Sequence, residues 1–276
     1  MSARQNLASW KKLQQLAQDK KSQHMNSLFA QDSERFEKFS IELPNMLLDY
    51  SKNLIDSETL DCLLALAQET EVCNWREKMF SGEKINKTED RAVLHTALRR
   101  QSNDPLIVDG ENVTEHVQNQ WEKMEVFVNK VRQGHWLGFS GKRITDIVNI
   151  GVGGSNLGPQ MVTEALKHYS DGSVNVHYVS NVDGAQIVEV LRPLEPEKVL
   201  FIVSSKTFTT TETMTNARTA MKWLTSASFD EKSVAKHFVA VTANKENAMS
   251  LGIKADNIFD MWDWVGGRFS LWSAIG

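Results

Sequence analysis

Apolar residues recur at helical spacing through the first half of the chain. The spacing i, i+3, i+4, i+7 marks one face of an α-helix. Such stripes consist of Leu7, Trp10, Leu13 and Leu16, of Leu60, Leu63, Leu64 and Ala67, and of Val113, Val117, Trp121, Met124, Val128 and Val131. Ser57 stands where the N-cap of the second of these helices is expected. Residues 1–135 are therefore predicted to be a helical segment without strands.

A further helix is predicted near residue 90. Asn86 followed by Glu89 resembles a capping box, in which the two side chains bond the first backbone N–H groups of a helix. An apolar stripe follows at helical spacing, formed by Val93, Leu94, Ala97 and Leu98.

From about Thr145 the pattern changes, and short apolar runs alternate with helical stretches. The runs are expected to be strands at Ile147–Ile150, Val174–Val179, Val199–Val203, Phe238–Val241 and Ile258–Met261. The helical stretches between them cover residues 159–169, 184–192, 210–225 and 245–251. Strands separated by helices form a parallel sheet with crossover helices. The fold class is therefore α/β, with a doubly wound five-stranded sheet in residues 136–276.

Composition removes several classes of function. The chain has 276 residues, 41% of them apolar, and a net charge of −4, so it lacks the basic excess that nucleic-acid binding needs. No apolar run approaches the ~20 residues that span a bilayer, and residues 1–10 lack the apolar core of a signal peptide. The two cysteines, Cys62 and Cys73, fit a reducing cytoplasm. No His or Cys pair has metal-ligand spacing, so no metal site is predicted.

A glycine-rich loop, GVGGSNLGP at residues 151–159, follows the first predicted strand. Glycines let backbone N–H groups approach an anion closely, and Pro159 suits the first position of a helix whose dipole attracts that anion. Asn156 stands where a dinucleotide fingerprint has its third glycine, and Pro159 stands where a Walker loop has lysine. An anion site is favoured over a nucleotide site, and a tight turn without ligand stays open as an alternative.

A hydroxyl-rich loop, SSKTFTTTET at residues 204–213, follows the third predicted strand. Its seven hydroxyl groups and Lys206 suit a phosphate monoester. Ser and Thr are also common at helix N-caps, so a capping cluster is the alternative. Because the carboxyl ends of parallel strands share one edge of the sheet, where such folds bind ligands, two loops of this kind favour phosphate binding.

A third loop, DWVGGRFS at residues 263–270, follows the fifth predicted strand. Gly266 and Gly267 allow a sharp turn that projects the guanidinium of Arg268, which can stabilise a developing oxyanion. A surface ion pair between Arg268 and Asp263 is the alternative. The chain stops at Gly276, where a loop leads toward a helix, so truncation of a longer protein is expected.

Together these loops resemble the glucose-6-phosphate isomerase (phosphoglucose isomerase) family. The stretches that carry the resemblance are Asn86–His95, Ile150–Pro159, Ser205–Ala217 and Asp263–Gly276. The family fold implies two sugar-isomerase (SIS) domains, each an αβα sandwich. By this resemblance residues 1–135 are the helical N-terminal segment, residues 136–276 are the first SIS-like domain, and the second domain is missing.

The resemblance also implies roles for individual residues. The substrate phosphate would bind Ser205, Lys206, Thr207 and Thr210, with Gly154 and Ser155 contributed by the glycine loop. Arg268, preceded by Gly267, would lie beside the reacting carbons. The glutamate base and the ring-opening histidine of the family belong to the missing half. Thr211 stands where many members have glutamine, and it adjoins the phosphate residues without replacing one.

The implied reaction interconverts glucose 6-phosphate and fructose 6-phosphate, in glycolysis and gluconeogenesis, through a cis-enediolate. It needs no cofactor, because no electrons leave the substrate. The family is homodimeric when full length. The alternative is a non-catalytic SIS module that binds sugar phosphates for regulation. Sugar-phosphate binding alone explains Arg268 poorly. A nucleotide-dependent enzyme is disfavoured by the glycine loop. On the isomerase interpretation this chain lacks the base, so alone it is expected to be inactive.

Overall fold

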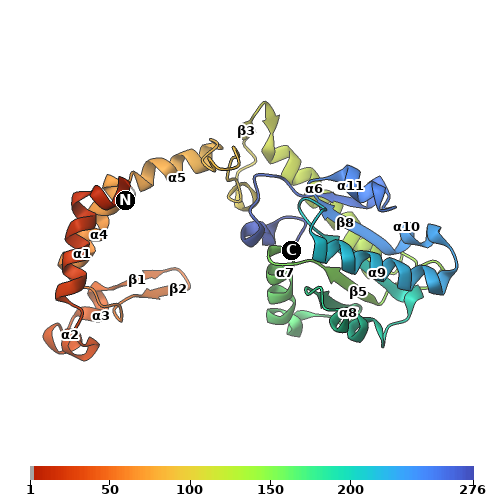
Figure 1. The fold of residues 1–276 in the computed structure, drawn as a ribbon, viewed down its shortest axis with the longest axis horizontal. Helices are drawn as coiled ribbons and strands as arrows, with labels where there is room; N and C mark the ends of the chain where they lie inside the picture. The colour runs from red at the N-terminus through yellow and green to blue at the C-terminus, as the bar shows by residue number, and fades with distance from the viewer. Residues whose placement is uncertain (1–2) are drawn as a thin grey trace. The chain divides into compact units, whose positions relative to one another are not determined.

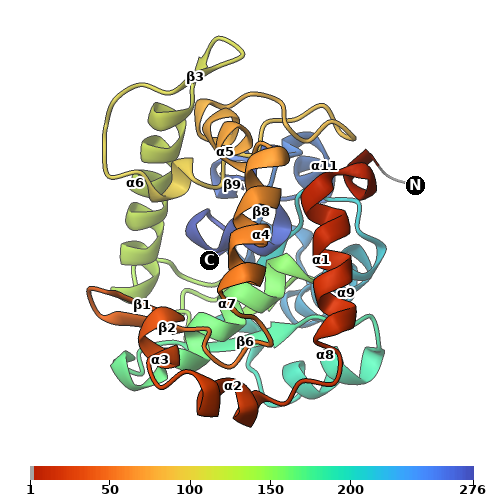
Figure 2. The same ribbon diagram turned by 90° about the vertical axis from the view of Figure 1, so that its left-hand side faces the viewer.

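The computed structural model describes residues 3–276, and by its internal contacts the chain divides into two compact units between Glu77 and Lys78. The α-helices of the first unit are α1 (Ala8–Asp19), α2 (Met25–Gln31), α3 (Arg35–Lys38), α4 (Ser57–Glu69) and the start of α5 (Val72–Ser81). As Figure 1 and Figure 2 show, α1 and α4 lie side by side. Their contact includes the Ser9 hydroxyl, which donates to the Glu69 carboxylate at 2.6 Å.

The first half of the chain departs from its predicted secondary structure in its strands. Residues 1–135 contain two short antiparallel pairs, β1 (Ser40–Leu43) with β2 (Met46–Asp49), and β3 (Ile107–Val108) with β4 (Glu111–Asn112). The prediction of no strands here is wrong. In β2 three consecutive apolar residues, Met46, Leu47 and Leu48, are exposed, so no alternation of apolar and polar residues marks this strand. β1 does alternate, but over only four residues, and its apolar side chains are exposed as well.

Two predicted helix starts are also wrong. The N-cap of α4 is Asp56 and not Ser57, because the Asp56 carboxylate accepts the N–H of Thr59 at 3.0 Å. Residues 86–96 form no helix. The Asn86 side-chain amide donates to the Glu89 carboxylate at 2.7 Å, and the Asn86 backbone pairs with Arg91. The paired side chains therefore close a turn, and only a 3-10 turn, η2 (Ala97–Arg99), follows.

The second unit is built on a parallel sheet. Its strands are β5 (Asp146–Ile150), β6 (Asn175–Val179), β7 (Val199–Ser204), β8 (Phe238–Thr242) and β9 (Ile258–Asp260). Its α-helices are α6 (Val113–Arg132), α7 (Gly154–Ala165), α8 (Gly184–Leu191), α9 (Thr211–Ser228), α10 (Val234–His237) and α11 (Lys245–Ser250), and a 3-10 helix, η7 (Gly267–Trp272), follows β9. The strand order β6-β5-β7-β8-β9 confirms the predicted doubly wound five-stranded sheet.

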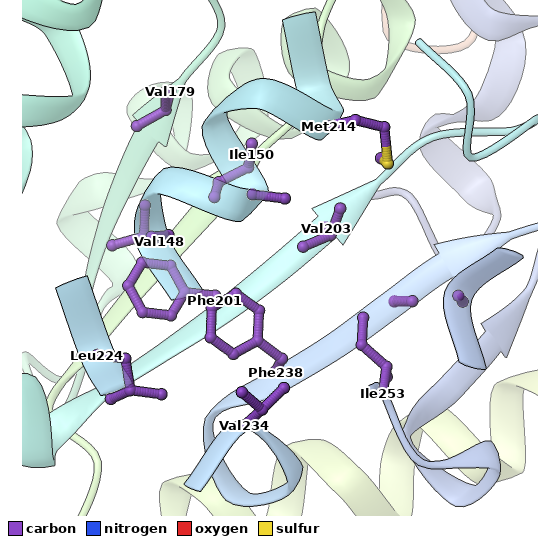
Figure 3. Packing of buried hydrophobic residues seen from close by; sticks show 14 of the residues in the cluster. Val148, Ile150, Val179, Phe201, Val203, Met214, Leu224, Val234, Phe238 and Ile253 are labelled. Atoms are coloured by element: carbon purple, nitrogen blue, oxygen red, sulfur yellow. The ribbon is translucent and has the colours of Figure 1, made fainter. Parts of the chain in front are cut away.

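Apolar side chains cover both faces of this sheet. On one face the strands pack against α8, α9 and α11, with the rings of Phe201 and Phe238 stacked 4.7 Å apart at the centre, as Figure 3 shows. On the other face α6 contributes Val113, Val117 and Val131 to a second cluster that includes residues of β7, β8 and β9. The division at residue 135 into a helical segment and a sheet domain stays a prediction. By its internal contacts the chain divides earlier, between Glu77 and Lys78. Helix α6 belongs to the second unit, because it packs on the sheet.

The strand order creates one switch point. The loop after β5 leads to β6 on one side, whereas the loop after the neighbouring β7 leads to β8 on the other side. Loops that diverge in this way leave a crevice at the carboxyl ends of the strands, where doubly wound sheets bind ligands. The glycine loop and the hydroxyl loop lie on either side of this switch point. Within residues 3–276, no helix has the length and apolar character needed to cross a membrane.

Candidate functional site

The glycine loop leads directly into α7. Gly153 is the N-cap residue and has a φ of +61°, a conformation that favours glycine. The helix begins at Gly154, earlier than predicted, so Pro159 lies inside it and not at its first position. The prediction for Pro159 is wrong because the loop tightens into a helix as soon as it leaves the strand. Gly154 is buried and Ser155 is half-buried in the first turn.

The glycine loop touches the third loop. A Cβ on Gly154 would lie 2.1 Å from the carbonyl oxygen of Gly267, so the two backbones pass each other too closely for any side chain. A Cβ on Gly153 would lie 2.8 Å from Nη1 of Arg268, which places the exposed guanidinium against the glycine loop. The Asp263 carboxylate lies instead 3.5 Å from the guanidinium of Arg91. The structure thus brings Gly154, Gly267 and Arg268 together.

The hydroxyl loop turns at a buried phenylalanine. Phe208 has a φ of +55° and is 3% exposed, so its side chain anchors the loop while the chain reverses. The buried Ser205 Oγ accepts the N–H of Phe208 at 3.2 Å and lies 3.3 Å from Oγ1 of Thr210. The hydroxyl of Thr209 donates to that of Thr207 at 2.8 Å, and Thr207, Thr209 and Thr210 are exposed. Hydroxyl groups therefore line the outer surface of the loop.

Lys206 connects the hydroxyl loop to the third loop. Its ammonium donates to the carbonyl oxygens of Asp263, at 2.7 Å, and Val265, at 3.1 Å. Partial burial lowers the pKa of Lys206 from its usual range, and the Asp263 carboxylate acts in the opposite direction. Lys206 therefore holds the hydroxyl loop and the third loop together and leaves a positive charge beside the exposed hydroxyls of Thr207 and Thr209.

Four helices begin at this edge of the sheet, and they differ at their first residues. Asp183 caps α8 by accepting the N–H of Ala185 at 2.9 Å, and Asn244 caps α11 by accepting the N–H of Asn247 at 3.0 Å. Among the described residues no side chain caps α7 or α9, although Thr210 is the N-cap residue of α9. The free N–H groups of a helix start attract anions. Both uncapped helices border the switch point.

A cleft with a volume of about 540 Å³ opens between the loops after β7, β8 and β9. Its lining residues are Lys206, Thr207, Thr209, Ala243, Asn244, Lys245, Glu246 and Asp263. Two of these, Lys206 and Thr207, belong to the predicted site. The residues contributed by the loop after β8 do not, although their position at a strand's carboxyl end was the signal that could have indicated them.

The segment that the sequence analysis assigned to a helix lies against the third loop. The N–H of Leu94 donates to the carbonyl of Trp264 at 3.0 Å, and the ring of His95 lies 4.7 Å from that of Phe269, the residue after Arg268. Partial burial lowers the pKa of His95, and the charge of Arg99 acts in the same direction. Sequence reasoning missed this neighbourhood, although residues 86–95 are part of the family resemblance. Within residues 3–276, no three His, Cys, Asp or Glu side chains gather as metal ligands would.

The fold and this edge define a doubly wound α/β domain with a glycine-rich loop and a hydroxyl-rich loop on either side of its switch point. The family model described as phosphoglucose isomerase matches residues 49–276, and the chain therefore belongs to the phosphoglucose isomerase family. Over all 276 residues it is 89% identical to the glucose-6-phosphate isomerase 1 of Colwellia psychrerythraea and 59% identical to the glucose-6-phosphate isomerase of Pseudoalteromonas translucida.

Among solved structures, a glucose-6-phosphate isomerase from Chlamydia trachomatis superposes with a TM-score of 0.82 at 27% identity. The match covers 99% of this chain and 51% of that one. The chain also covers 50% of each of the two curated relatives, so it spans about half the length of the proteins it matches.

Proposed function

We propose that this chain forms the sugar-phosphate-binding half of a glucose-6-phosphate isomerase, which interconverts glucose 6-phosphate and fructose 6-phosphate. The observation that carries the proposal is the pair of uncapped helix starts, α7 and α9, on either side of one switch point. The exposed hydroxyls of the loop before α9 and the guanidinium beside the loop before α7 supply further donors. Membership of the family and the names of the curated relatives support the same activity.

The phosphate is assigned to the hydroxyl loop. Thr207 and Thr210 would donate their exposed hydroxyls, Ser205 would support Thr210 from beneath, and Lys206 would supply positive charge. The free N–H groups at the start of α9 would bond the remaining phosphate oxygens. Gly154 and Ser155 would bring the start of α7 to the sugar. Binding a phosphate away from the reacting carbons provides the energy that positions those carbons.

The chemical step requires a base, an acid and an oxyanion stabiliser. Isomerisation moves a proton between adjacent carbons, so that a carboxylate removes it from one carbon and returns it to the other. Arg268 would stabilise the negative charge of the enediolate between the two transfers. Glu212 lies in the first turn of α9, where its negative charge interacts favourably with the positive end of the helix dipole. Asp183 caps α8. We therefore assign the base and the ring-opening group to the half of the enzyme outside this chain.

Two further features belong to the proposal. The full-length protein is proposed to be a homodimer in which the second subunit completes the site, as in the family. A cytoplasmic location is proposed from the cysteines, because Cys62 and Cys73 are free thiols and a glycolytic substrate is found there.

The decisive experiment measures turnover by the complete gene product in an assay coupled to glucose 6-phosphate oxidation, with fructose 6-phosphate as substrate. We expect saturable isomerisation that 6-phosphogluconate inhibits competitively. Binding of sugar phosphates without turnover by the complete product would favour the regulatory alternative.

The same assay on the 276-residue chain tests how the site is divided. We expect sugar-phosphate binding without turnover, because the loss of a base costs a factor of about 10²–10⁴ or more. Turnover within about tenfold of the complete product would place a base inside these residues and contradict the assignment. Circular dichroism and a cooperative melting transition serve as controls for folding of the isolated chain.

A further inference from the structure

The carbonyl group of Ser155 has lost its ordinary helical partner. In an α-helix the carbonyl of a residue accepts the N–H of the residue four positions later. For Ser155 that residue is Pro159, which has no N–H and lies inside α7. A buried carbonyl without a donor costs free energy comparable to that of a lost hydrogen bond. The start of α7 therefore needs a donor from outside the helix.

Asn149 supplies that donor from the middle of the sheet. It lies on β5, opposite Tyr178 of β6 and Ile202 of β7, and it is 5% exposed. Its side-chain Nδ2 donates to the carbonyl of Ser155 at 3.0 Å. Because a carbonyl can only accept, the amide nitrogen must face Ser155, and this fixes the direction in which the amide oxygen points.

The amide oxygen of Asn149 faces the hydroxyl loop. The hydroxyl of Ser204, which is 1% exposed at the end of β7, donates to Oδ1 of Asn149 at 3.0 Å. Ser204 is followed directly by Ser205, whose N–H bonds the carbonyl of Val241 on β8 at 3.0 Å. One buried amide thus joins the first turn of α7 to the residue from which the hydroxyl loop departs.

We propose that Asn149 is a positioning residue that sets the distance between the glycine loop and the hydroxyl loop, and hence the width of the crevice that receives the sugar phosphate. The inference rests on the proposed function for the identity of the ligand. Asn149 need not touch the ligand. It acts through Ser155 and Ser204, and its two bonds lie beside the last pair of the β5–β7 ladder, Ile150 with Val203, beyond which the two loops diverge.

A matched control exists in the same unit. Asn257 is 7% exposed and also donates its side-chain amide to backbone carbonyls, those of Ala235 at 2.9 Å and Phe238 at 3.2 Å. These bonds lie at the start of β8 and β9, at the opposite edge of the sheet from the crevice. Asn149→Ala and Asn257→Ala therefore remove the same chemical group from equally buried positions, one at the crevice and one remote from it.

The experiment compares these two variants and Ser204→Ala in the complete gene product. The measurements are KM and kcat for fructose 6-phosphate, Kd for inorganic phosphate, and the melting temperature. For Asn149→Ala we expect KM and the phosphate Kd to rise about tenfold or more. This is the effect of losing one charge-assisted hydrogen bond to the phosphate, because the loop that donates it is misplaced. Asn149→Ala and Asn257→Ala are expected to lower the melting temperature by similar amounts. In Asn257→Ala, however, KM and Kd should stay within about twofold of their wild-type values. Ser204→Ala, which breaks one of the two bonds, is expected to raise both about threefold.

Equal changes in KM and Kd for Asn149→Ala and Asn257→Ala would overturn the proposal, because a purely structural asparagine would act through stability alone. If Asn149→Ala does not fold, an unchanged KM and Kd in folded Ser204→Ala overturns it equally. Wild-type protein that binds phosphate but does not turn over would contradict the proposed function. The phosphate Kd values would still decide whether Asn149 positions the loops.

Discussion

The four helix starts at the carboxyl edge of the sheet form two kinds. α8 and α11 satisfy their first N–H groups with their own N-cap side chains, Asp183 and Asn244. No side chain caps α7 or α9 among the described residues. In α7 the N–H groups of Ser155 and Asn156 donate instead to the carbonyls of Val152, at 3.3 Å, and Gly153, at 3.1 Å, and the loops before both helices are held by contacts with other loops and with the sheet. A capped start already has an acceptor and adds stability, whereas an uncapped start keeps its donors for a ligand. On the proposed function, the difference separates the helices of this edge that are structural from those that bind the ligand.

The largest expected effect comes from a side chain at the start of α7. Gly154 and Gly184 are the first residues of α7 and α8. In Gly154→Ala the new Cβ would lie 2.1 Å from the Gly267 carbonyl oxygen, so the glycine loop and the third loop must separate. We expect kcat/KM to fall by more than about 10²-fold and stability to fall by about 1–3 kcal/mol or more, as for an overpacked site.

Gly184→Ala is the control for this substitution. Apart from its chain neighbours and the backbone of its own helix, no heavy atom lies within 4 Å of the new Cβ, so stability should change by less than about 1 kcal/mol and kinetics should stay the same. Assays of the complete product and urea unfolding of each variant measure both quantities. Similar kinetics for the two variants would show that contact between the backbones of the two loops is dispensable.

The second expected effect concerns the guanidinium beside the glycine loop. Arg268→Lys keeps the charge but loses the planar fork, so kcat should fall by about 10²-fold, as for a lost oxyanion donor. Arg192→Lys is the control, since Arg192 forms an exposed ion pair with Glu189. Steady-state kinetics distinguish two roles. A rise in KM at constant kcat would make Arg268 a ground-state binder and contradict the assignment.

A tenfold effect is expected at the start of α9. Each hydroxyl bond to a phosphate is worth about 1.5–3 kcal/mol, so Thr210→Ala should raise KM for fructose 6-phosphate about tenfold or more. Stability should fall by less than about 1 kcal/mol, because this side chain caps no N–H group. Thr219→Ala, on the same helix and exposed, serves as control. An unchanged KM in Thr210→Ala removes Thr210 from the phosphate site.

The smallest kinetic effect is expected at the capped start of α8. A substitution there should change stability and leave the kinetics unchanged. Asp183→Ala removes the acceptor for the N–H of Ala185 and should lower the free energy of unfolding by about 1 kcal/mol. KM and kcat should not change. Chemical denaturation together with the coupled assay tests this. A tenfold rise in KM would mean that the capped helix also binds substrate, and the distinction between the two kinds of helix start would fail.

The extent to which sequence predicted this structure depends on the range of the interactions. The five strands and the helices between them were predictable because buried parallel strands are short apolar runs, as at Val199–Ser204. The helix predicted after Asn86 was not formed, because its capping residues instead close a turn that packs on the third loop through Leu94. The hairpin β1–β2 was missed, because the alternation in β1 covers only four residues and β2 has three apolar residues in a row.

For the candidate site the sequence determined which loops carry donors and at which edge of the sheet they lie, because loop composition and strand direction are local properties. The assigned binding roles of these residues remain predictions. Only the tertiary structure decided what each residue contacts. Lys206 bonds the carbonyls of Asp263 and Val265, and Asn149 bonds across the switch point to Ser155 and Ser204. These contacts depend on which strands become neighbours and how closely their loops approach, which apolar periodicity along the chain does not encode.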